Sequence, residues 1–344
     1  MLRILVFLLF VTNIPLQAQD DLGALLEGGT ADAEILVQQY IEPLVDGSGF
    51  GLSGGWYNTA KTHKPFGIDL SITATAAYAP NSDLSYNPEG LGLTNIEFVD
   101  PNQEYPTALG DTQPIPRFNV IDDNGDIITD TPIEGPVGFD FLEDIPSIFS
   151  NAVPVPMIQL GIGLVKNTDL KVRYGQDFGL GDDDFEFRVL GFGIQHDIKQ
   201  WIPFVKKLPI DVAVLLAYTD IDSEVQNIGG IEDLDDRLEF DTNVFTGQLL
   251  VSKQFSVFTI YSGFGFNAIS SDVNVLGTYQ LESDEIIVDP VTLGFNSGGG
   301  RATFGARVKL GFFSIFTDYT FQEYDNWTIG LSLINIRENK NGIL

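Results

Sequence analysis

Five basic residues of this chain have a type and spacing that could form a binding site. They are Lys171, Arg173, Arg188, Arg307 and Lys309. Successive side chains of a β-strand point to opposite faces, so residues two apart, such as Lys171 and Arg173, share one face. Ammonium and guanidinium groups on one face can hold an anionic head group. They can equally pair with carboxylates, because a buried charge without a partner is costly. The sequence leaves both interpretations open: a ligand-binding patch, or ion pairs that brace the interior.

The acidic residues concentrate in other segments, where they could hold divalent cations. Carboxylate oxygens are the usual ligands of Ca²⁺ and Mg²⁺. The run Asp122-Asp123-Asn124-Gly125-Asp126 superficially resembles a calcium loop, but its spacing is not that of an EF-hand, and Asn124-Gly125 is also a hairpin signal. Other acids lie at 182–184, 232–236 and 282–289. We predict solvated acidic loops without a dedicated metal site, and keep divalent cations as a candidate partner.

The sequence does not predict an enzyme. A hydrolase of the Ser–His type needs a histidine beside its nucleophile, and the chain has only His63 and His196. His63 is expected at the outer end of the first hairpin, and His196 at the membrane interface. The chain contains no phosphate-binding Walker loop and no zinc-binding HExxH pattern. We therefore expect neither catalysis nor a cofactor.

The elements that must position these residues alternate with a period of two. In the segment 66–78, apolar side chains from Phe66 to Tyr78 share one face, and Asp69, Ser71 and Thr73 share the other. The segment is about twice as long as a common globular strand. This length suits a tilted transmembrane strand. An apolar face toward lipid and a polar face toward an interior explain both properties.

Twelve segments of this kind predict an all-β protein, an antiparallel transmembrane β-barrel. They are 49–58, 65–79, 90–98, 155–165, 169–176, 185–196, 208–220, 239–252, 254–267, 300–310, 312–323 and 326–336. Short and long connections alternate, as periplasmic turns and extracellular loops do in outer-membrane barrels. Fourteen strands is the alternative, if 99–154 or 270–290 supplies another pair. A soluble β-sandwich competes less well, because its strands are shorter and fill one apolar core.

The N-terminal region differs from the rest. Residues 1–18 read as a signal peptide, with one positive charge, a short apolar run and Ala18 before the cleavage point. Residues 19–47 have helical spacing, with a helix that ends at Pro43. We therefore divide the chain into a signal peptide (1–18), a helical plug or cap (19–47), an outer-membrane barrel (48–336) with an extracellular loop at 99–154, and a periplasmic tail (337–344).

Composition limits the partners. The 344 residues carry a formal charge of −30 and no cysteine. Nucleic-acid binding needs clustered Lys and Arg to neutralise phosphates, so this class is excluded. Without cysteine there is no disulfide framework and no thiolate metal site. The expected partner is the lipid bilayer of the outer membrane, with girdle side chains from Trp56, Tyr57, Trp201, Tyr319 and Trp327.

The chain resembles uncharacterised exported β-barrels of Gram-negative outer membranes. The residues that carry this resemblance are Asp21–Gly29, Tyr40-Ile41-Glu42-Pro43, Gly49-Phe50-Gly51 and Gly54–Lys61. More loosely, the layout is similar to fatty-acid-transporter-type barrels, in which an N-terminal helical plug fills the lumen. The resemblance implies that Ile35, Leu36, Tyr40 and Leu44 pack inside the barrel.

Three functions are consistent with this layout. The first is the binding or passage of a small hydrophobic or amphipathic molecule. The second is a non-transporting surface or assembly component with acidic loops, and the third is a general aqueous porin. Function inferred from architecture is analogy, so these stay hypotheses at this point.

Overall fold

The computed structural model describes residue 26 and residues 28–122, 124–138, 151–176, 185–226, 236–280 and 286–334. The predicted signal peptide (1–18) and the tail (337–344) lie outside the described residues. So do the acidic positions 182–184, 232–235 and 282–285.

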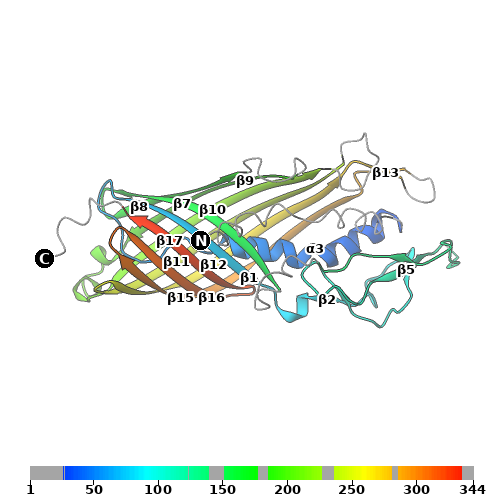
Figure 1. The fold of residues 1–344 in the computed structure, drawn as a ribbon, viewed down its shortest axis with the longest axis horizontal. Coiled ribbons are helices and arrows are strands. Elements are labelled where there is room, and N and C mark those ends of the chain that lie inside the picture. Colours follow the sequence, from blue (N-terminus) through cyan, green and yellow to red (C-terminus); the bar gives the residue numbers. More distant parts are fainter. Residues whose placement is uncertain are drawn as a thin grey trace.

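A closed antiparallel barrel forms the centre of the molecule (Figure 1). Within the described residues its wall has ten strands, so the predictions of twelve and of fourteen are both wrong. The strands are β1 (Ile68–Tyr78), β7 (Ala152–Leu164), β8 (Thr168–Gln176), β9 (Phe185–Asp197), β10 (Asp211–Gln226), β11 (Arg237–Phe255), β12 (Phe258–Leu276), β15 (Val291–Leu310), β16 (Phe313–Phe321) and β17 (Asp325–Ile334). Neighbours in this order pair with each other, and β1 pairs with β17 to close the wall.

The alternation predicted for β1 is present. Ile68, Leu70 and Ile72 are 40–46% exposed on the outer surface, whereas Ser71 and Thr73 face inward and are at most 4% exposed. The same arrangement leaves a belt of large apolar side chains around the whole barrel. Apolar surface of this extent requires a hydrophobic environment. The polar side chains of the wall face the interior instead, where they can form hydrogen bonds.

The barrel has two unlike ends. At one end the strands are joined by brief connections after β7, β11 and β15, and by two short 3-10 turns, η4 (Lys199–Trp201) and η5 (Val205–Lys207), after β9. We call this the short-turn end. The other, the long-loop end, carries the connection from β1 to β7, which spans 79–151, and the hairpin of β13 (Thr278–Gln280) and β14 (Ile286–Val288).

Residues 79–138 fold into a head at the long-loop end (Figure 1). They contain η2 (Asn81–Asp83) and two small sheets, one of β2 (Ser85–Tyr86) and β4 (Tyr105–Pro106), the other of β3 (Ile96–Phe98), β5 (Arg117–Val120) and β6 (Ile133–Glu134). The predicted barrel strand at 90–98 is therefore wrong, because only β3 forms there and it pairs within the head. The predicted hairpin at Asn124-Gly125 is present, with Ile121 bridged to Ile127.

One long helix, α3 (Thr30–Leu52), runs from the head into the lumen (Figure 1). It continues through Pro43, so the prediction that the helix ends there, and the boundary at 47, are wrong. The predicted strand at 49–58 is wrong for the same reason. Gly47, Gly49 and Gly51 explain the error: a Cβ on each would lie 2.5–2.6 Å from a wall side chain. Glycine at every second position lets a helix pass close to the wall, but the same alternation in the sequence predicts a strand.

Residues 53–67 continue from α3 through the lumen to the short-turn end, where β1 begins. We call residues 30–67 the plug. Among the described residues no helix is long and apolar enough to cross a membrane.

Asp32 fastens the first turn of α3 to the head. Its buried carboxylate accepts the backbone N–H groups of Thr94, Asn95 and Ile96 at 2.7–3.0 Å, and the Thr94 hydroxyl at 3.1 Å. Hydrogen bonds to a charged acceptor are stronger than those between neutral groups. The head and the plug are therefore one packed unit.

Replacing Asp32 by asparagine is expected to loosen this junction by about 2 kcal/mol, because one acceptor oxygen becomes a donor that faces backbone N–H groups. Hydrogen exchange should show faster exchange of the amides of residues 94–96, with the barrel strands unchanged. Glu34→Gln, on the exposed side of the same turn, is the matched control. Equal protection in Asp32→Asn and wild type would contradict the assignment.

A basic pocket at the short-turn mouth of the lumen

Arg173, which the sequence singles out as a ligand-binding base, is fully buried and binds the plug. Its Nη1 donates to the Leu52 carbonyl at 2.8 Å and its Nη2 to the Gly54 carbonyl at 2.5 Å. Nε donates to Gln159 at 3.2 Å, and the guanidinium lies 3.7 Å from the ring centre of Trp56. Groups of the chain itself thus accept hydrogen bonds from all three guanidinium nitrogens and cover one face of the group.

Two further lumen bases act in the same way. The Lys171 ammonium donates to the Trp56 carbonyl at 2.8 Å. Arg301 donates through Nη1 to the Ser53 carbonyl at 3.0 Å and to Asn267 at 2.9 Å. Arg301 was not predicted as a lumen residue, although its spacing places it on the same face as Arg307 and Lys309. The lumen bases thus satisfy backbone carbonyls of an irregular segment, a role that neither sequence interpretation included.

Arg188 is not a lumen residue. It lies on the outer surface near the long-loop end, with its side chain 67% exposed, and Nε donates to Asp222 of β10 at 2.9 Å. Its predicted inward orientation is therefore wrong.

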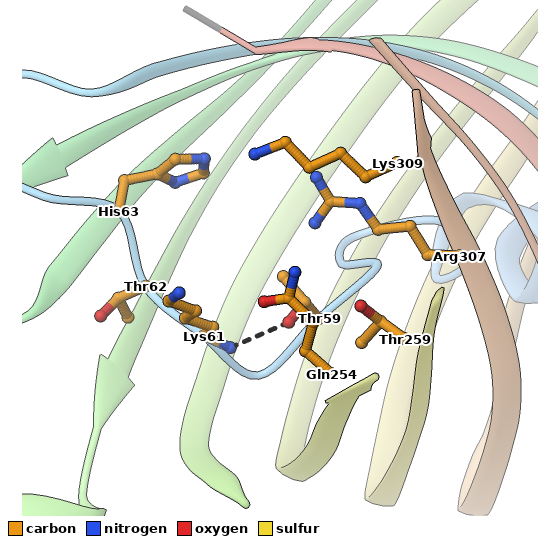
Figure 2. Close-up of a pocket in the computed structure, with 8 residues that line it drawn as sticks. All are labelled: Thr59, Lys61, Thr62, His63, Gln254, Thr259, Arg307 and Lys309. Atoms are coloured by element: carbon orange, nitrogen blue, oxygen red, sulfur yellow. Dashed lines mark hydrogen bonds between the residues drawn. The ribbon is translucent and has the colours of Figure 1, made fainter. Parts of the chain in front are cut away.

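Arg307 and Lys309 face inward at the short-turn mouth and line the same cavity as Lys61 of the plug (Figure 2). Together with Thr59, Thr62, His63, Gln254 and Thr259 they line a cavity of about 50 Å³, which we call the basic pocket. Arg307 Nε donates to Ser314 at 3.0 Å. Among the described residues, neither Lys61 nor Lys309 lies within 4.0 Å of a carboxylate.

The contacts of His63 and Thr59 do not form a nucleophile–base pair. His63 Nδ1 lies 2.9 Å from Asp169, which also accepts the His63 backbone N–H at 2.9 Å. The Thr59 hydroxyl pairs with Ser252 at 3.1 Å. His63 was predicted at the outer end of a hairpin, but it lies at the opposite end because the preceding residues cross the lumen as part of the plug. His196 contacts Thr168 and the ring of Trp201 near η4.

The four predicted plug residues all lie on α3, at different depths of burial. Leu36 and Tyr40 are buried, and Ile35 and Leu44 are half-buried. The Tyr40 hydroxyl donates to the Val137 carbonyl of the head at 2.9 Å. Four further plug residues, which were not predicted as such, lie deeper in the lumen and are at most 5% exposed: Phe50, Leu52, Trp56 and Tyr57. Trp56 and Tyr57 are therefore interior residues, and their prediction as girdle residues is wrong.

The described residues contain no group of three or more His, Cys, Asp or Glu side chains that could hold a metal ion. The Asp122 carboxylate accepts the backbone N–H groups of Asn124 and Asp126, each at 2.9 Å. These hydrogen bonds, that of Asp126 foremost, hold the pKa of Asp122 below its usual value. The carboxylate thus shapes its own hairpin. Divalent cations at the other acidic loops stay a prediction.

A closed antiparallel barrel with an even number of strands, an apolar outer belt and a polar interior defines an outer-membrane β-barrel. In this class the short turns lie on the periplasmic side and the long loops outside the cell. The chain belongs to the family described as "Family of unknown function (DUF6588)", whose model matches residues 1–334. The prediction of an uncharacterised outer-membrane barrel family is confirmed.

No curated protein matches the chain. Among solved structures, it is similar to the attachment invasion locus protein Ail of Yersinia pestis, with 7% identity, a TM-score of 0.26, and coverage of 79% of this chain and 100% of Ail. For the outer membrane protease OmpT of Escherichia coli the values are 7%, 0.30, 80% and 100%. For a FadL homologue of Pseudomonas aeruginosa they are 8%, 0.21, 79% and 89%. At this level of similarity, what these proteins do says nothing about this chain.

Proposed function

We propose that this outer-membrane barrel binds a small amphipathic molecule by its anionic head group in the basic pocket, while the plug keeps the lumen closed to bulk solutes. The observation that carries the proposal is that three basic residues, Lys61, Arg307 and Lys309, line one polar cavity (Figure 2). A cavity of about 50 Å³ has room for a head group and not for a whole amphiphile. The apolar tail would therefore extend out of the pocket.

Binding fits the plug better than passage does. Arg173, Arg301 and Asn326 each hold a backbone carbonyl of residues 50–54 by a hydrogen bond of 2.5–3.0 Å. Phe50 stacks on Tyr324 with ring centres 5.4 Å apart. A path through the lumen would break these buried contacts. The proposal includes no catalytic step and no cofactor, and it keeps the predicted signal peptide, cleaved after Ala18, as the route of export.

The experiment compares decanoate with decanol, which share an alkyl chain and differ in charge. Isothermal titration of the full chain in dodecyl maltoside should detect decanoate binding, and Arg307→Gln/Lys309→Gln should weaken it by about tenfold or more. Lys206→Gln/Lys207→Gln removes the same charge outside the lumen and should bind as wild type does. Equal binding of decanoate and decanol, or unchanged binding in the pocket variant, would refute the proposal.

The second candidate, a surface or assembly component, is favoured by the head. Residues 79–138 contain eleven acidic residues and one base, and they fold on α3 rather than over an open lumen. The hairpin tip exposes Ile127 and Ile128, at 55% and 59%. This candidate predicts that a photocrosslinker at residue 127 captures one cell-surface partner, with decanoate binding absent. Decanoate binding without a crosslinked partner would favour the first candidate.

A further inference from the structure

Five segments at the short-turn end share a composition. They are 64–67, 165–167, 198–208, 253–258 and 311–313. Each contains at least one large apolar side chain that is more than half exposed; these are Phe66, Val165, Trp201, Phe204, Val257 and Phe312. None of the five segments contains an acidic residue, in a chain with 48 of them.

The lysines gather at the same end. The chain has ten, and eight of them belong to these segments or to the short-turn mouth. Lys61 and Lys309 face the basic pocket, and Lys199 is used within its own turn, where Nζ donates to the Leu208 carbonyl at 2.8 Å. The remaining five form the lysine collar: Lys64, Lys166, Lys206, Lys207 and Lys253. The head at the opposite end is strongly acidic, so the molecule is electrically polarised along the barrel axis.

The geometry of the collar suits a membrane surface. The chain from η4 to η5 presents Trp201, 68% exposed, and Phe204, 77% exposed, beside the exposed Lys206 and Lys207. On the outer face of β11, Lys253 Nζ lies 4.9 Å from the ring centre of Phe255. Aromatic rings prefer the head-group level of a bilayer, and lysine stems cover apolar surface while the ammonium reaches water. Asp197, the acidic residue just before η4, is half-buried and accepts the Lys199 N–H at 2.8 Å.

We propose that the lysine collar binds the anionic phospholipid head groups of the leaflet at the short-turn end. Charge complementarity carries the inference, because an ammonium near an anionic surface gains free energy that a neutral lipid does not provide. The apolar side chains between the lysines set the depth at which the collar lies. This site is separate from the basic pocket and does not depend on the ligand proposed there.

The test measures which lipids surround the barrel. The full chain is reconstituted in phosphatidylcholine vesicles with spin-labelled phosphatidylglycerol or spin-labelled phosphatidylcholine, and the protein-associated fraction of each label is compared. Wild type is expected to prefer phosphatidylglycerol, and Lys206→Gln/Lys207→Gln to lower the preference by about fivefold or more. Salt at 0.5 M is expected to reduce the wild-type preference, since the Debye length then falls to about 4 Å.

A matched control separates a local effect from a change in net charge. Arg117→Gln/Arg188→Gln also removes two cations, but at the long-loop end, and should keep the wild-type preference. All variants are checked for the shift in gel mobility on heating that a folded barrel shows. Equal association of both lipids with wild type would overturn the proposal, as would an equal loss of preference in both double variants. An acidic protein as the true occupant would give the first of these results.

Discussion

Replacing Arg173 by methionine is expected to lower the free energy of unfolding by about 3–5 kcal/mol, the cost of three buried acceptors left without a donor. Methionine has a similar length but no donors, so the Leu52 and Gly54 carbonyls and the Gln159 side chain lose their partner in a buried site. The stacking on Trp56 is lost as well. Unpaired buried acceptors pay their full desolvation cost, which makes this the largest single-residue effect that we expect.

Two controls isolate the cause of this loss. Arg188→Met removes an exposed guanidinium that pairs with Asp222, and should cost about 0–1 kcal/mol. Arg173→Lys keeps the charge but not the fork, so its stability should fall between wild type and Arg173→Met. Urea unfolding in lipid vesicles, followed by gel mobility, measures all three. A change within about 1 kcal/mol for Arg173→Met would show that water or other donors replace the guanidinium.

The plug is expected to determine the ion conductance of the barrel. The full chain in a planar bilayer should give almost no steady current, whereas a variant without residues 30–58 should conduct more than about tenfold better. Barrels of eight strands are filled by their own side chains, and those of sixteen or more enclose channels. Small polar residues of this ten-stranded wall, Thr75 and Thr73, lie beside Gly54 and Gly55, so the space that the deleted segment leaves there would fill with water.

A covalent tether tests the same point without a deletion. In wild type a Cβ on Gly51 would lie 3.6 Å from the Ala77 Cβ, which is within the range of a disulfide. The chain has no native cysteine. Gly51→Cys/Ala77→Cys, with Val155→Ala to give the new side chain room, should fix the plug to β1. Val155→Ala alone is the control.

Three results are distinguishable. If neither wild type nor the tethered variant carries current, and the deletion variant does, the barrel is permanently closed. Current in wild type that stops on oxidation of the tether would assign the plug as a gate. Current in wild type that the tether leaves unchanged would support the aqueous porin instead.

The wall of the barrel was predictable from the sequence because its physical cause is local. The strands carry an apolar side chain at every second position toward lipid, and β1 shows the alternation with a polar inward side most clearly. The two segments that were wrongly predicted as barrel strands, 49–58 and 90–98, alternate for other reasons. In residues 49–52 glycine alternates with apolar residues, because the helix needs glycine where it lies against the wall. Ile96 and Phe98 are apolar because they belong to the core of the head.

The candidate site was predictable only in part. Lys171, Arg173, Arg307 and Lys309 do face the lumen, but Arg188 does not. Along β9, Leu190, Phe192 and Ile194 face lipid, whereas Val189 is 2% exposed and packs against the lumen cluster that contains Phe50. Beyond the membrane the apolar residues of a strand face inward, toward the plug. Periodicity alone therefore assigns Arg188 to the wrong side of the wall. Nothing in the sequence showed that Arg173 would bind carbonyls 119 and 121 residues earlier in the chain.

The course of the plug limits the order in which the protein can assemble. Its first turn is fastened to the head at one mouth, and its last residues pair beside β7 at the other, where the Phe66 N–H donates to the Gly163 carbonyl at 2.8 Å. A segment held at both mouths cannot be pushed through a finished cylinder. If the first turn of α3 binds the head before the plug is in place, a seam of the wall such as that between β1 and β17 must still be open. A barrel that closes first can take up the plug only with the N-terminal end of α3 leading, and before that end binds the head.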